Sequence, residues 1–419
     1  MSLPRMVEAR QNIHTPKVDD YVSAIKKEMR KAGLHEKVKP GMHIAITAGS
    51  RGIAHYAEVL ATVVEEVKEA GGEPFLVPSM GSHGGATPEG QLNVLKSLGI
   101  TPECVGAPIC ASMEVDEIGK LGNGAPVYVD RAALKSDGII VVNRIKPHTD
   151  FKGRIESGLM KMMAIGLGKQ KGAEMIHSYQ SEGYHENMPA AARLIMEKAP
   201  IMLGLAVVEN AFHEIATVKA LRPQEIEREE VKLLEEAKNL LARIPFKEID
   251  LLIVEEIGKD ISGVGMDSNV IGRFWVPGEY DPQAPKIGRV VVLDLSEGTH
   301  GNAIGIGLAD LTTKKAVDKI DFHQTFINSL TACWSETAKT PVFLPNDLEA
   351  ISIGLRLCGP IAPEKAKVVR IKNTLDLCRM WISESLCETV RSDRELSKKI
   401  EIVGEPKEMQ FDVLGMLAR

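Results

Sequence analysis

Residues 136–177 read SDGIIVVNRIKPHTDFKGRIESGLMKMMAIGLGKQKGAEMIH, which joins a β-branched apolar run to a basic loop and a glycine-rich segment. The run at 138–143 predicts a buried strand, because it is short, apolar and bounded by turn residues. His148 follows in the next loop, Lys161 stands among methionines, and a helical segment ends at His177. Ligand sites in α/β proteins usually lie in loops that follow strands, so this stretch is the first candidate for chemistry.

Two similar strand–loop–helix units come earlier in the chain. Strands are predicted at 43–47 and 74–78, and each is followed by a loop and a helix. The helix at 55–70 has valines on one face and charged residues on the other, which is typical of a helix packed on a sheet. Thr87 and Pro88 suit the N-cap and first position of the second helix. Successive βα units predict an α/β fold with a parallel, helix-covered sheet.

The chain of 419 residues is too long for one ordinary core and predicts two domains. A long helix at 223–243 carries glutamates and lysines at spacings that suit a solvated face. A new apolar strand begins soon after it. We therefore expect an N-terminal cofactor-binding and catalytic domain over 1–245 and a C-terminal α/β domain over 246–400. Each is expected to hold a mainly parallel sheet with flanking helices, with the active site in the cleft between them and residues 400–419 returning to the first domain.

The composition is that of a globular protein without a strong charge bias. Hydrophobic residues make up 44% and charged residues 26%, and the net charge is −6. This balance gives no electrostatic reason to expect a nucleic acid or an anionic membrane as partner. No apolar run approaches the roughly 18 residues of a membrane span, and no export signal is visible. The six cysteines form no CxxC pair, so we expect reduced thiols in a cytoplasmic protein.

Arg51, His83 and His148 follow three predicted strands of the first half. If those strands are parallel neighbours, the three side chains converge at one edge of the sheet. Arginine suits capture of a carboxylate or phosphate, and histidine is the usual acid or base near neutral pH. The glycine-rich loop of His83 also offers Gly84 and Thr87, beside a helix N-terminus, as contacts for a cofactor phosphate.

Each candidate also has an ordinary structural interpretation. A strand-end arginine often forms a structural ion pair, and a loop histidine is often solvated. Lys161 is either a lysine whose amine snorkels to solvent or an amine held for chemistry. His177 could be a favourable charge at a helix C-terminus as well as a ligand. The sequence holds no HExxH motif, CxxC pair or P-loop. The residues alone therefore indicate an α/β enzyme with a basic, histidine-bearing cleft.

The order of these motifs resembles that of the nickel-pincer nucleotide-dependent lactate racemase family. In that family a nicotinate-derived, bis-thiolated mononucleotide binds nickel and is tethered to a lysine, and a histidine about sixteen residues further on coordinates the metal. His177 follows Lys161 by 16 residues here. The resemblance covers most of the chain and is strongest over 43–90 and 136–180. The matching motifs, in order, are Ser50-Arg51-Gly52, Gly81-Ser82-His83, Pro147-His148, Lys161 and His177.

The resemblance implies a role for each of these residues. Lys161 would form the covalent link to the nickel-pincer nucleotide (pyridinium-3,5-bisthiocarboxylic acid mononucleotide nickel), and His177 would complete the coordination of Ni(II), which suits imidazole with soft donors. His83 and His148 would be paired acid/base groups, and Arg51 would hold the substrate carboxylate. The implied activity is racemisation or epimerisation of a small 2-hydroxy acid by reversible hydride transfer, in a protein loaded by the cofactor's biosynthetic enzymes.

Three departures from the family pattern concern the cofactor spacing and the substrate. Lys161 follows His148 by 13 residues instead of about ten, which implies a short insertion within 149–160. Ala48 stands where the family has an acid before its arginine. The family's glutamine and lysine from the second domain are missing, and Arg273 is the candidate replacement at the substrate. These changes predict a hydroxy acid other than lactate.

Two alternatives stay open at the level of sequence. A conventional zinc-dependent hydrolase using the same histidines predicts bound zinc and an unmodified Lys161. A non-catalytic protein that binds nucleotides or phosphate predicts that His83→Ala leaves ligand binding unchanged.

Overall fold

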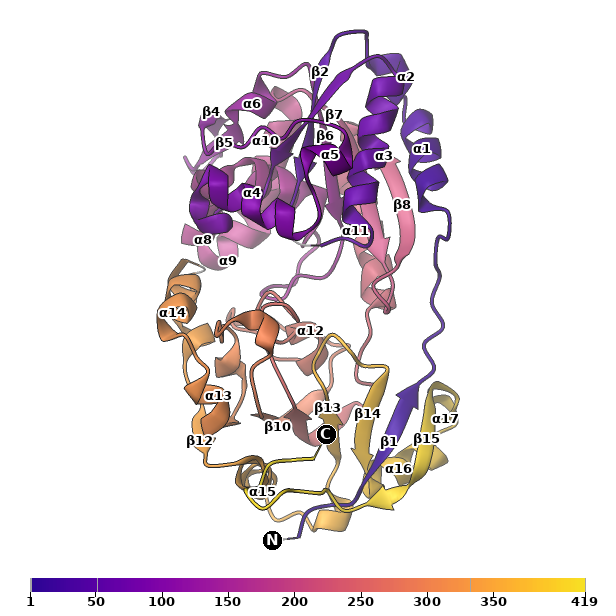
Figure 1. Cartoon of the computed structure of the whole chain (residues 1–419), viewed down its shortest axis with the longest axis vertical. Coiled ribbons are helices and arrows are strands. Elements are labelled where there is room, and N and C mark those ends of the chain that lie inside the picture. Colours follow the sequence, from indigo (N-terminus) through magenta and orange to yellow (C-terminus); the bar gives the residue numbers. More distant parts are fainter. Residues whose placement is uncertain (1, 51, 332, 419) are drawn as a thin grey trace. The chain divides into compact units, whose positions relative to one another are not determined.

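The computed structural model describes residues 2–50, 52–331 and 333–418. The chain divides into two units, which do not follow a single cut in the sequence (Figure 1). The N-terminal unit contains Thr15–His148 and Gly153–Leu241, and the C-terminal unit contains Met1–His14, Thr149–Lys152 and Ala242–Arg419. Both units contain a sheet with helices against it, so the predicted α/β class is confirmed.

The sheet of the N-terminal unit has the strand order β3-β2-β6-β7-β8. The first four strands are parallel, and β8 is antiparallel to β7. The predicted strands are all present, while the antiparallel edge strand is an addition. Because β3, β2 and β6 are parallel neighbours, the loops that follow them leave the sheet at one edge. The strands are β2 (His43–Ala48), β3 (Glu73–Pro78), β6 (Gly138–Arg144), β7 (Ile201–Glu209) and β8 (Ile215–Leu221).

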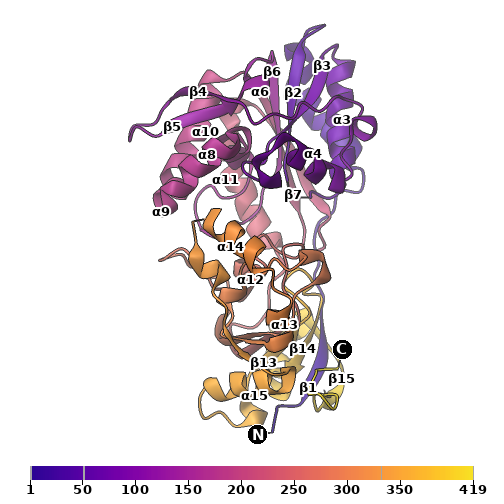
Figure 2. The same cartoon turned by 60° about the vertical axis from the view of Figure 1, so that its left-hand side comes forward.

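Helices cover both faces of this sheet (Figures 1 and 2). On one face, alternate strand residues such as Ile44, Ile46 and Ile140 are fully buried in a core shared with α1 and α3. On the other face, Gly204 of β7 lies against α11, where an added Cβ would sit 3.1 Å from Ile226 Cδ1. The covering elements are α1 (Tyr21–Lys31), α2 (Leu34–Lys37), α3 (Tyr56–Glu69), α4 (Pro88–Ser97), α5 (Pro102–Val105), α6 (Arg131–Leu134), α11 (Pro223–Leu240) and the hairpin of β4 (Val115–Lys120) and β5 (Pro126–Asp130).

A helical run with two widened, π-helical turns extends from residue 159 to residue 198. Glycine permits the first widened turn, since a Cβ at Gly168 would lie 2.4 Å from the Ala164 carbonyl oxygen. Such turns occur often at functional sites. The sequence predicts only the helical segments near 173–177 and 188–198. The run consists of α7 (Leu159–Lys161), η2 (Met162–Leu167), α8 (Lys169–Ser178), α9 (Gln180–Glu182), η3 (Gly183–Asn187) and α10 (Met188–Lys198).

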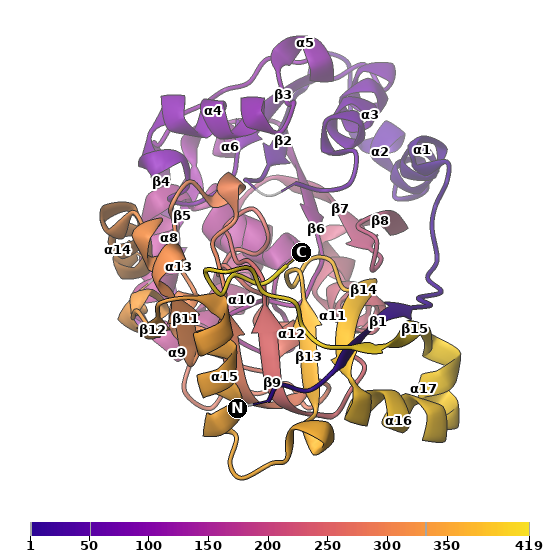
Figure 3. The ribbon, with the colours of Figure 1, turned by 60° about the horizontal axis from the view of Figure 1, so that its bottom comes forward.

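The sheet of the C-terminal unit has the order β12-β11-β10-β9-β13-β14-β1-β15. Strands β9 to β13 are parallel, whereas β14, β1 and β15 are antiparallel to their neighbours (Figure 3). The strands are β1 (Met6–Gln11), β9 (Glu248–Val254), β10 (Lys286–Val292), β11 (Leu311–Thr313), β12 (Val342–Leu344), β13 (Val368–Ile371), β14 (Arg379–Ser383) and β15 (Ile400–Lys407).

The two ends of the chain meet in this second sheet. Strand β1 pairs with β14 on one side and β15 on the other, and Val7 and Ala9 are buried in the core of the C-terminal unit. The sequence predicts both ends in the first domain. The structure differs because β1 and β15 satisfy each other's backbone groups, a pairing between distant segments. The N-terminal unit ends at Leu241, close to residue 245, where the sequence predicts the end of the first domain.

The helices of the C-terminal unit are short. They are α12 (Ser268–Ile271), α13 (Lys314–Asp318), α14 (Phe322–Thr331), α15 (Asp347–Leu357), α16 (Glu384–Ser392) and α17 (Arg394–Lys399), with 3₁₀ turns η4 (Glu297–Thr299), η5 (Ile306–Leu308), η6 (Ser335–Ala338) and η7 (Pro363–Lys365). Across the described parts of both units, every helix is too short or too polar to cross a membrane.

Candidate active site

Three loops of the N-terminal unit leave the sheet at the carboxyl ends of neighbouring strands. Ser50 follows β2, His83 follows β3 and His148 follows β6. Ser50 Oγ and His83 Nδ1 form a hydrogen bond, which joins the first two loops. Arg51, the predicted substrate-binding residue, lies outside the described residues.

The loop of His83 is shaped by close contacts with helix α4. Gln91 of that helix donates from Nε2 to the carbonyl oxygens of Gly81 and His83, at 3.0 and 3.4 Å. Gly84 has a positive φ of 68°, and Thr87 caps α4 by accepting the Gly90 N–H at 3.1 Å. Gly84 and Thr87 therefore have structural roles in this loop. Their contact with a cofactor stays a prediction.

The loop of His148 is closed at its base by backbone bonding between Lys146 and Ser157, with the Lys146 N–H at 2.9 Å from the Ser157 oxygen. The buried carboxylate of Glu156 accepts the His148 N–H at 2.7 Å and the Gly153 N–H at 3.2 Å. Glu156 thus binds the backbone on both sides of Thr149–Lys152, the segment that belongs to the C-terminal unit. These hydrogen bonds hold the backbone of the His148 loop in place.

Lys161 lies beside His148, and His148 and His177 both contact one aromatic ring. Lys161 Nζ lies 2.5 Å from His148 Nε2, so the 13-residue spacing still delivers the lysine to the loop of His148. The buried ring of Tyr184, on η3, has its centroid 5.9 Å from that of His148 and 5.7 Å from that of His177. These residues come from the loop after β6, from α7, from α8 and from η3.

Tyr184 is a member of this cluster that the sequence does not indicate. It lies seven residues beyond His177 in a helical region, where a tyrosine has an ordinary packing role. The widened turn η3 carries the ring that contacts both histidines, and such a turn is not visible in hydrophobic periodicity.

Helix α11 places two charged side chains against the segments that carry Lys161 and His148. Glu230 is 1% exposed, and its Oε2 accepts the Met160 N–H at 3.1 Å. Burial raises the pKa of the Glu230 carboxyl to about 8. Lys238 Nζ lies 3.2 Å from Glu156 Oε1. The sequence predicts a solvated charged face for this helix, and for Glu230 that prediction is wrong, because its side chain points into the unit.

Arg273, the second predicted substrate-binding residue, belongs to the C-terminal unit and is engaged there. Its guanidinium donates to the Leu308 carbonyl oxygen at 2.7 Å and lies 2.7 Å from the Asp310 carboxylate. The arginine therefore forms an ion pair within the C-terminal unit, and its contact with a substrate stays a prediction.

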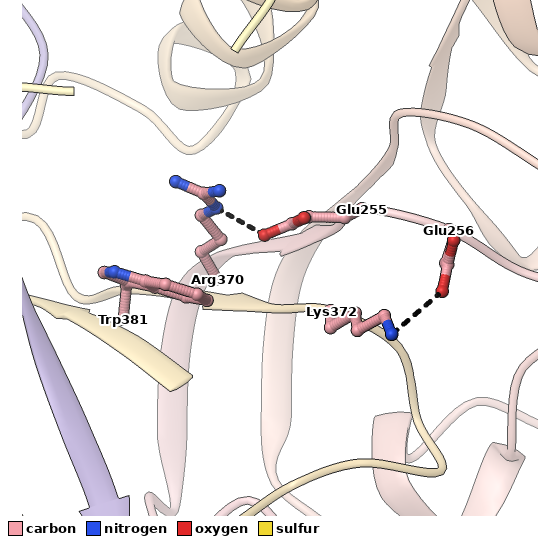
Figure 4. Close-up of a pocket in the computed structure, with 5 residues that line it drawn as sticks. All are labelled: Glu255, Glu256, Arg370, Lys372 and Trp381. Carbon is pink, nitrogen blue, oxygen red and sulfur yellow. Dashed lines mark hydrogen bonds and ion pairs between the residues drawn. The ribbon is translucent and has the colours of Figure 1, made fainter. Parts of the chain in front are cut away.

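A pocket of about 190 Å³ lies in the C-terminal unit, at the ends of β9 and β13 (Figure 4). Its charges pair with one another: Arg370 Nε is 2.7 Å from Glu255, and Lys372 Nζ is 4.0 Å from Glu256. The Arg370 guanidinium also stacks 4.5 Å from the ring centroid of Trp381. None of the predicted site residues lines this pocket.

One cluster of metal-binding side chains occurs among the described residues. It consists of His35, Glu66 and Glu69. Arg30 occupies it with its guanidinium, at 2.6 Å from Glu66 and 2.7 Å from Glu69. The cluster does not include any histidine of the candidate site.

Comparison with known proteins shows a similarity to one family model over the N-terminal part of the chain. Residues 4–186 match the family model described as the lactate racemase N-terminal domain. Similar solved structures include the lactate racemase apoprotein from Thermoanaerobacterium thermosaccharolyticum, which is 14% identical with a TM-score of 0.48, over 83% of this chain and 86% of that chain. A protein from Thermotoga maritima is 15% identical with a TM-score of 0.50, over 84% of this chain and 96% of that chain, which shows a shared fold. None of the curated proteins matches the sequence.

The region that matches the family model contains the whole histidine–lysine cluster. It includes strands β2, β3 and β6 with their loops, and it extends through Lys161 and His177 to Tyr184. This region of the chain is therefore similar to the lactate racemase N-terminal domain.

Proposed function

We propose that the protein is a racemase or epimerase of a small 2-hydroxy acid. The observation that carries this proposal is the grouping of an amine with two imidazoles: Lys161 Nζ lies beside His148, and His148 and His177 both contact the Tyr184 ring. A lysine with only a packing role would not need its amine beside an imidazole. An amine and an imidazole in one cluster are what a tethered, metal-binding cofactor requires.

The residues present fit the nickel-pincer nucleotide. Lys161 supplies a primary amine for the covalent link, and His177 supplies an imidazole, a suitable ligand for Ni(II) beside soft donors. When bound, this group would supply the acceptor and donor of hydride. The protein itself must bind the hydroxy acid, orient it and move the hydroxyl proton.

The two strand-end histidines are proposed to move that proton. A racemase needs a base on one side of the substrate and an acid on the other, and His83 and His148 come from separate loops at one sheet edge. Ser50 engages Nδ1 of His83, so proton exchange at that ring is assigned to Nε2. Arg51 is proposed to bind the substrate carboxylate. Arg273 is left out, because Asp310 already holds it.

The proposal is tested with protein produced alongside the cofactor's biosynthetic enzymes. Racemisation of a panel of 2-hydroxy acids is followed by chiral chromatography. His83→Asn and His148→Asn are each expected to lower the rate by about 10²–10⁴, the usual contribution of a general acid or base. His213→Asn, an exposed histidine of the same unit, is the matched control and should keep the wild-type rate.

Substrate deuterated at C2 gives the sharper result. Hydride return predicts product that keeps its deuterium in ordinary water, whereas exchange of the label with solvent indicates simple proton abstraction. Loss of the label, or full activity in both histidine variants, would overturn the proposed mechanism.

A further inference from the structure

Helix α11 supports both functional segments from behind. Glu230 and Lys238 are eight residues apart, which is close to two turns, so both side chains project from similar faces of the helix. Glu230 reaches the start of α7, and Lys238 reaches Glu156 in the loop of His148. One helix thus contacts the supports of both Lys161 and His148.

Glu230 replaces a missing helix cap. Gly158 is the N-cap residue of α7 and has no side chain to accept a hydrogen bond from the first turn. Glu230 Oε2 accepts the Met160 N–H instead, and a carboxyl oxygen can accept this hydrogen bond whether the group is neutral or ionised. Lys161 directly follows Met160 in the chain. The hydrogen bond from Glu230 therefore holds the same helical turn that presents the Lys161 amine.

The Glu230 carboxyl lies very close to Gly158, and its burial there destabilises the fold. A Cβ at Gly158 would lie 2.2 Å from Glu230 Oε1, so any larger residue there would force the Glu230 carboxyl to shift. Glu230 Oε1 has no hydrogen-bond partner among the described residues, and no cation pairs with the carboxylate there. A buried carboxyl with an oxygen that lacks a hydrogen bond destabilises a fold. Proteins keep such destabilising groups mainly at functional sites.

Lys238 acts on His148 through Glu156. The Glu156 side chain is fully buried, and Lys238 lies 3.2 Å from Oε1. Glu156 in turn accepts the His148 N–H at 2.7 Å. Lys238 thus lies against the same side chain that accepts both backbone N–H groups of the loop.

We propose that α11 is a positioning element of the site, in which Glu230 fixes the turn that presents Lys161 and Lys238, through Glu156, fixes the backbone of His148. The inference rests on the proposed roles of Lys161 and His148. It concerns only contacts within the N-terminal unit.

The Glu230 half is tested on full-length protein made without the cofactor's biosynthetic enzymes. Lysines are labelled with trace acetic anhydride at pH 8, and the labelling of Lys161 relative to the other lysines is measured by peptide mass spectrometry. Glu230→Leu removes the cap, so Lys161 is expected to label at least threefold faster. Glu230→Gln keeps an acceptor oxygen and should label like wild type. Glu229→Gln, which neutralises the neighbouring carboxylate, is the matched control and should also be unchanged.

The Lys238 half is tested by hydrogen exchange at the His148 amide, measured on the same apoprotein. Lys238→Met removes a partly exposed side chain, and the variant is therefore expected to fold. Without the cation, Glu156 holds the His148 N–H less firmly, and exchange is expected to be at least tenfold faster.

Folded Glu230→Leu with wild-type labelling of Lys161 overturns the first half. Wild-type exchange at His148 in Lys238→Met overturns the second half, and this measurement stays informative where Glu230→Leu does not fold. Both readouts are independent of cofactor and turnover. Failure of the proposed function would appear instead as absence of racemisation in the loaded protein, with these results unchanged.

Discussion

At the scale of single residues, Gly158 and Glu230 form a close-fitting pair in the candidate site. Gly158→Ala would force its Cβ toward Glu230 Oε1, at a starting separation of 2.2 Å. Overpacking of this kind typically costs about 1–3 kcal/mol. We expect Gly158→Ala to lower the free energy of unfolding by that amount, and to cost less in a Glu230→Ala background, where the carboxyl is gone.

A double-mutant cycle in urea measures this coupling. Residues in direct contact show interaction free energies of roughly 0.5–3 kcal/mol. Strictly additive costs for the two substitutions would contradict the contact.

Glu230 also predicts a pH dependence of stability. Burial raises its pKa to about 8 in the folded protein, from an ordinary 4.5, and the charge of Glu227 adds to this. Between these values the folded state binds more protons than the unfolded state, so stability falls as pH rises. The full penalty, on the order of a few kcal/mol, is present above pH 8 and absent below pH 4.5.

Urea unfolding of wild type and Glu230→Gln at pH 5 and pH 9 tests the sign. The glutamine variant cannot ionise, so its stability relative to wild type should be greater at pH 9 than at pH 5. An equal pH dependence in the two proteins would show that Glu230 does not titrate in this way.

The sequence indicates the chemistry-bearing residues better than their supports. His83, His148, Lys161 and His177 are reactive residue types, and their order and spacing can be compared with a known family. Glu156, Glu230 and Tyr184 act through contacts between distant segments, and nothing in the local pattern separates them from ordinary helix or loop residues. Their roles therefore become visible only in the structure.

At the scale of elements, helix α8 is anchored by a buried charge at its start. Lys169 is fully buried, has a positive φ of 52° and bonds to the Pro78 carbonyl oxygen at the end of β3. Its Nζ lies 3.1 Å from the equally buried Asp130 carboxylate. The lysine thus ties the helix that carries His177 to the sheet edge from which the loop of His83 departs.

Removing one partner of the Lys169–Asp130 pair is expected to lower the free energy of unfolding strongly. Lys169→Met leaves Asp130 buried without its cation, which typically costs about 3–5 kcal/mol. The double variant Lys169→Met with Asp130→Asn should be less destabilised than Lys169→Met alone. Urea unfolding of the three proteins decides this, and equal loss in the single and double variants would contradict it.

The strands and amphipathic helices of the N-terminal unit were accessible to sequence reasoning because their burial is periodic or continuous. Strand β8 was missed because it is partly exposed, and η2 and η3 were missed because a widened turn disturbs helical periodicity only slightly. For α11, the helix itself is evident from the sequence. The inward orientation of Glu230 is not, because glutamate in a charged helix ordinarily faces solvent.

At the scale of the whole molecule, the chain starts in the unit in which it ends. Strand β1 lies between β14 and β15 inside the sheet of the C-terminal unit. No local pattern predicts such a pairing, since it joins segments nearly 400 residues apart. It has a clear consequence for truncation, because loss of β1 leaves β15 without the strand that it pairs with and leaves β14 paired with β13 alone.

A chain that begins at Thr15 is expected to keep the N-terminal unit and to destabilise the C-terminal unit. Native-state hydrogen exchange should show lost protection in β14 and β15, with protection in β2, β6 and β7 close to that of the full chain. Uniform loss of protection in both units would contradict this separation.

The central claim, that Lys161 carries a nickel-binding cofactor, is tested most directly by intact mass and metal analysis after production with the cofactor's biosynthetic enzymes. The account predicts added mass on wild-type protein, mapped to Lys161 and accompanied by nickel, with both lost in Lys161→Ala. A characterised lactate racemase loaded in the same cells is the positive control. Wild-type protein that gains neither mass nor nickel while that control gains both would contradict the account.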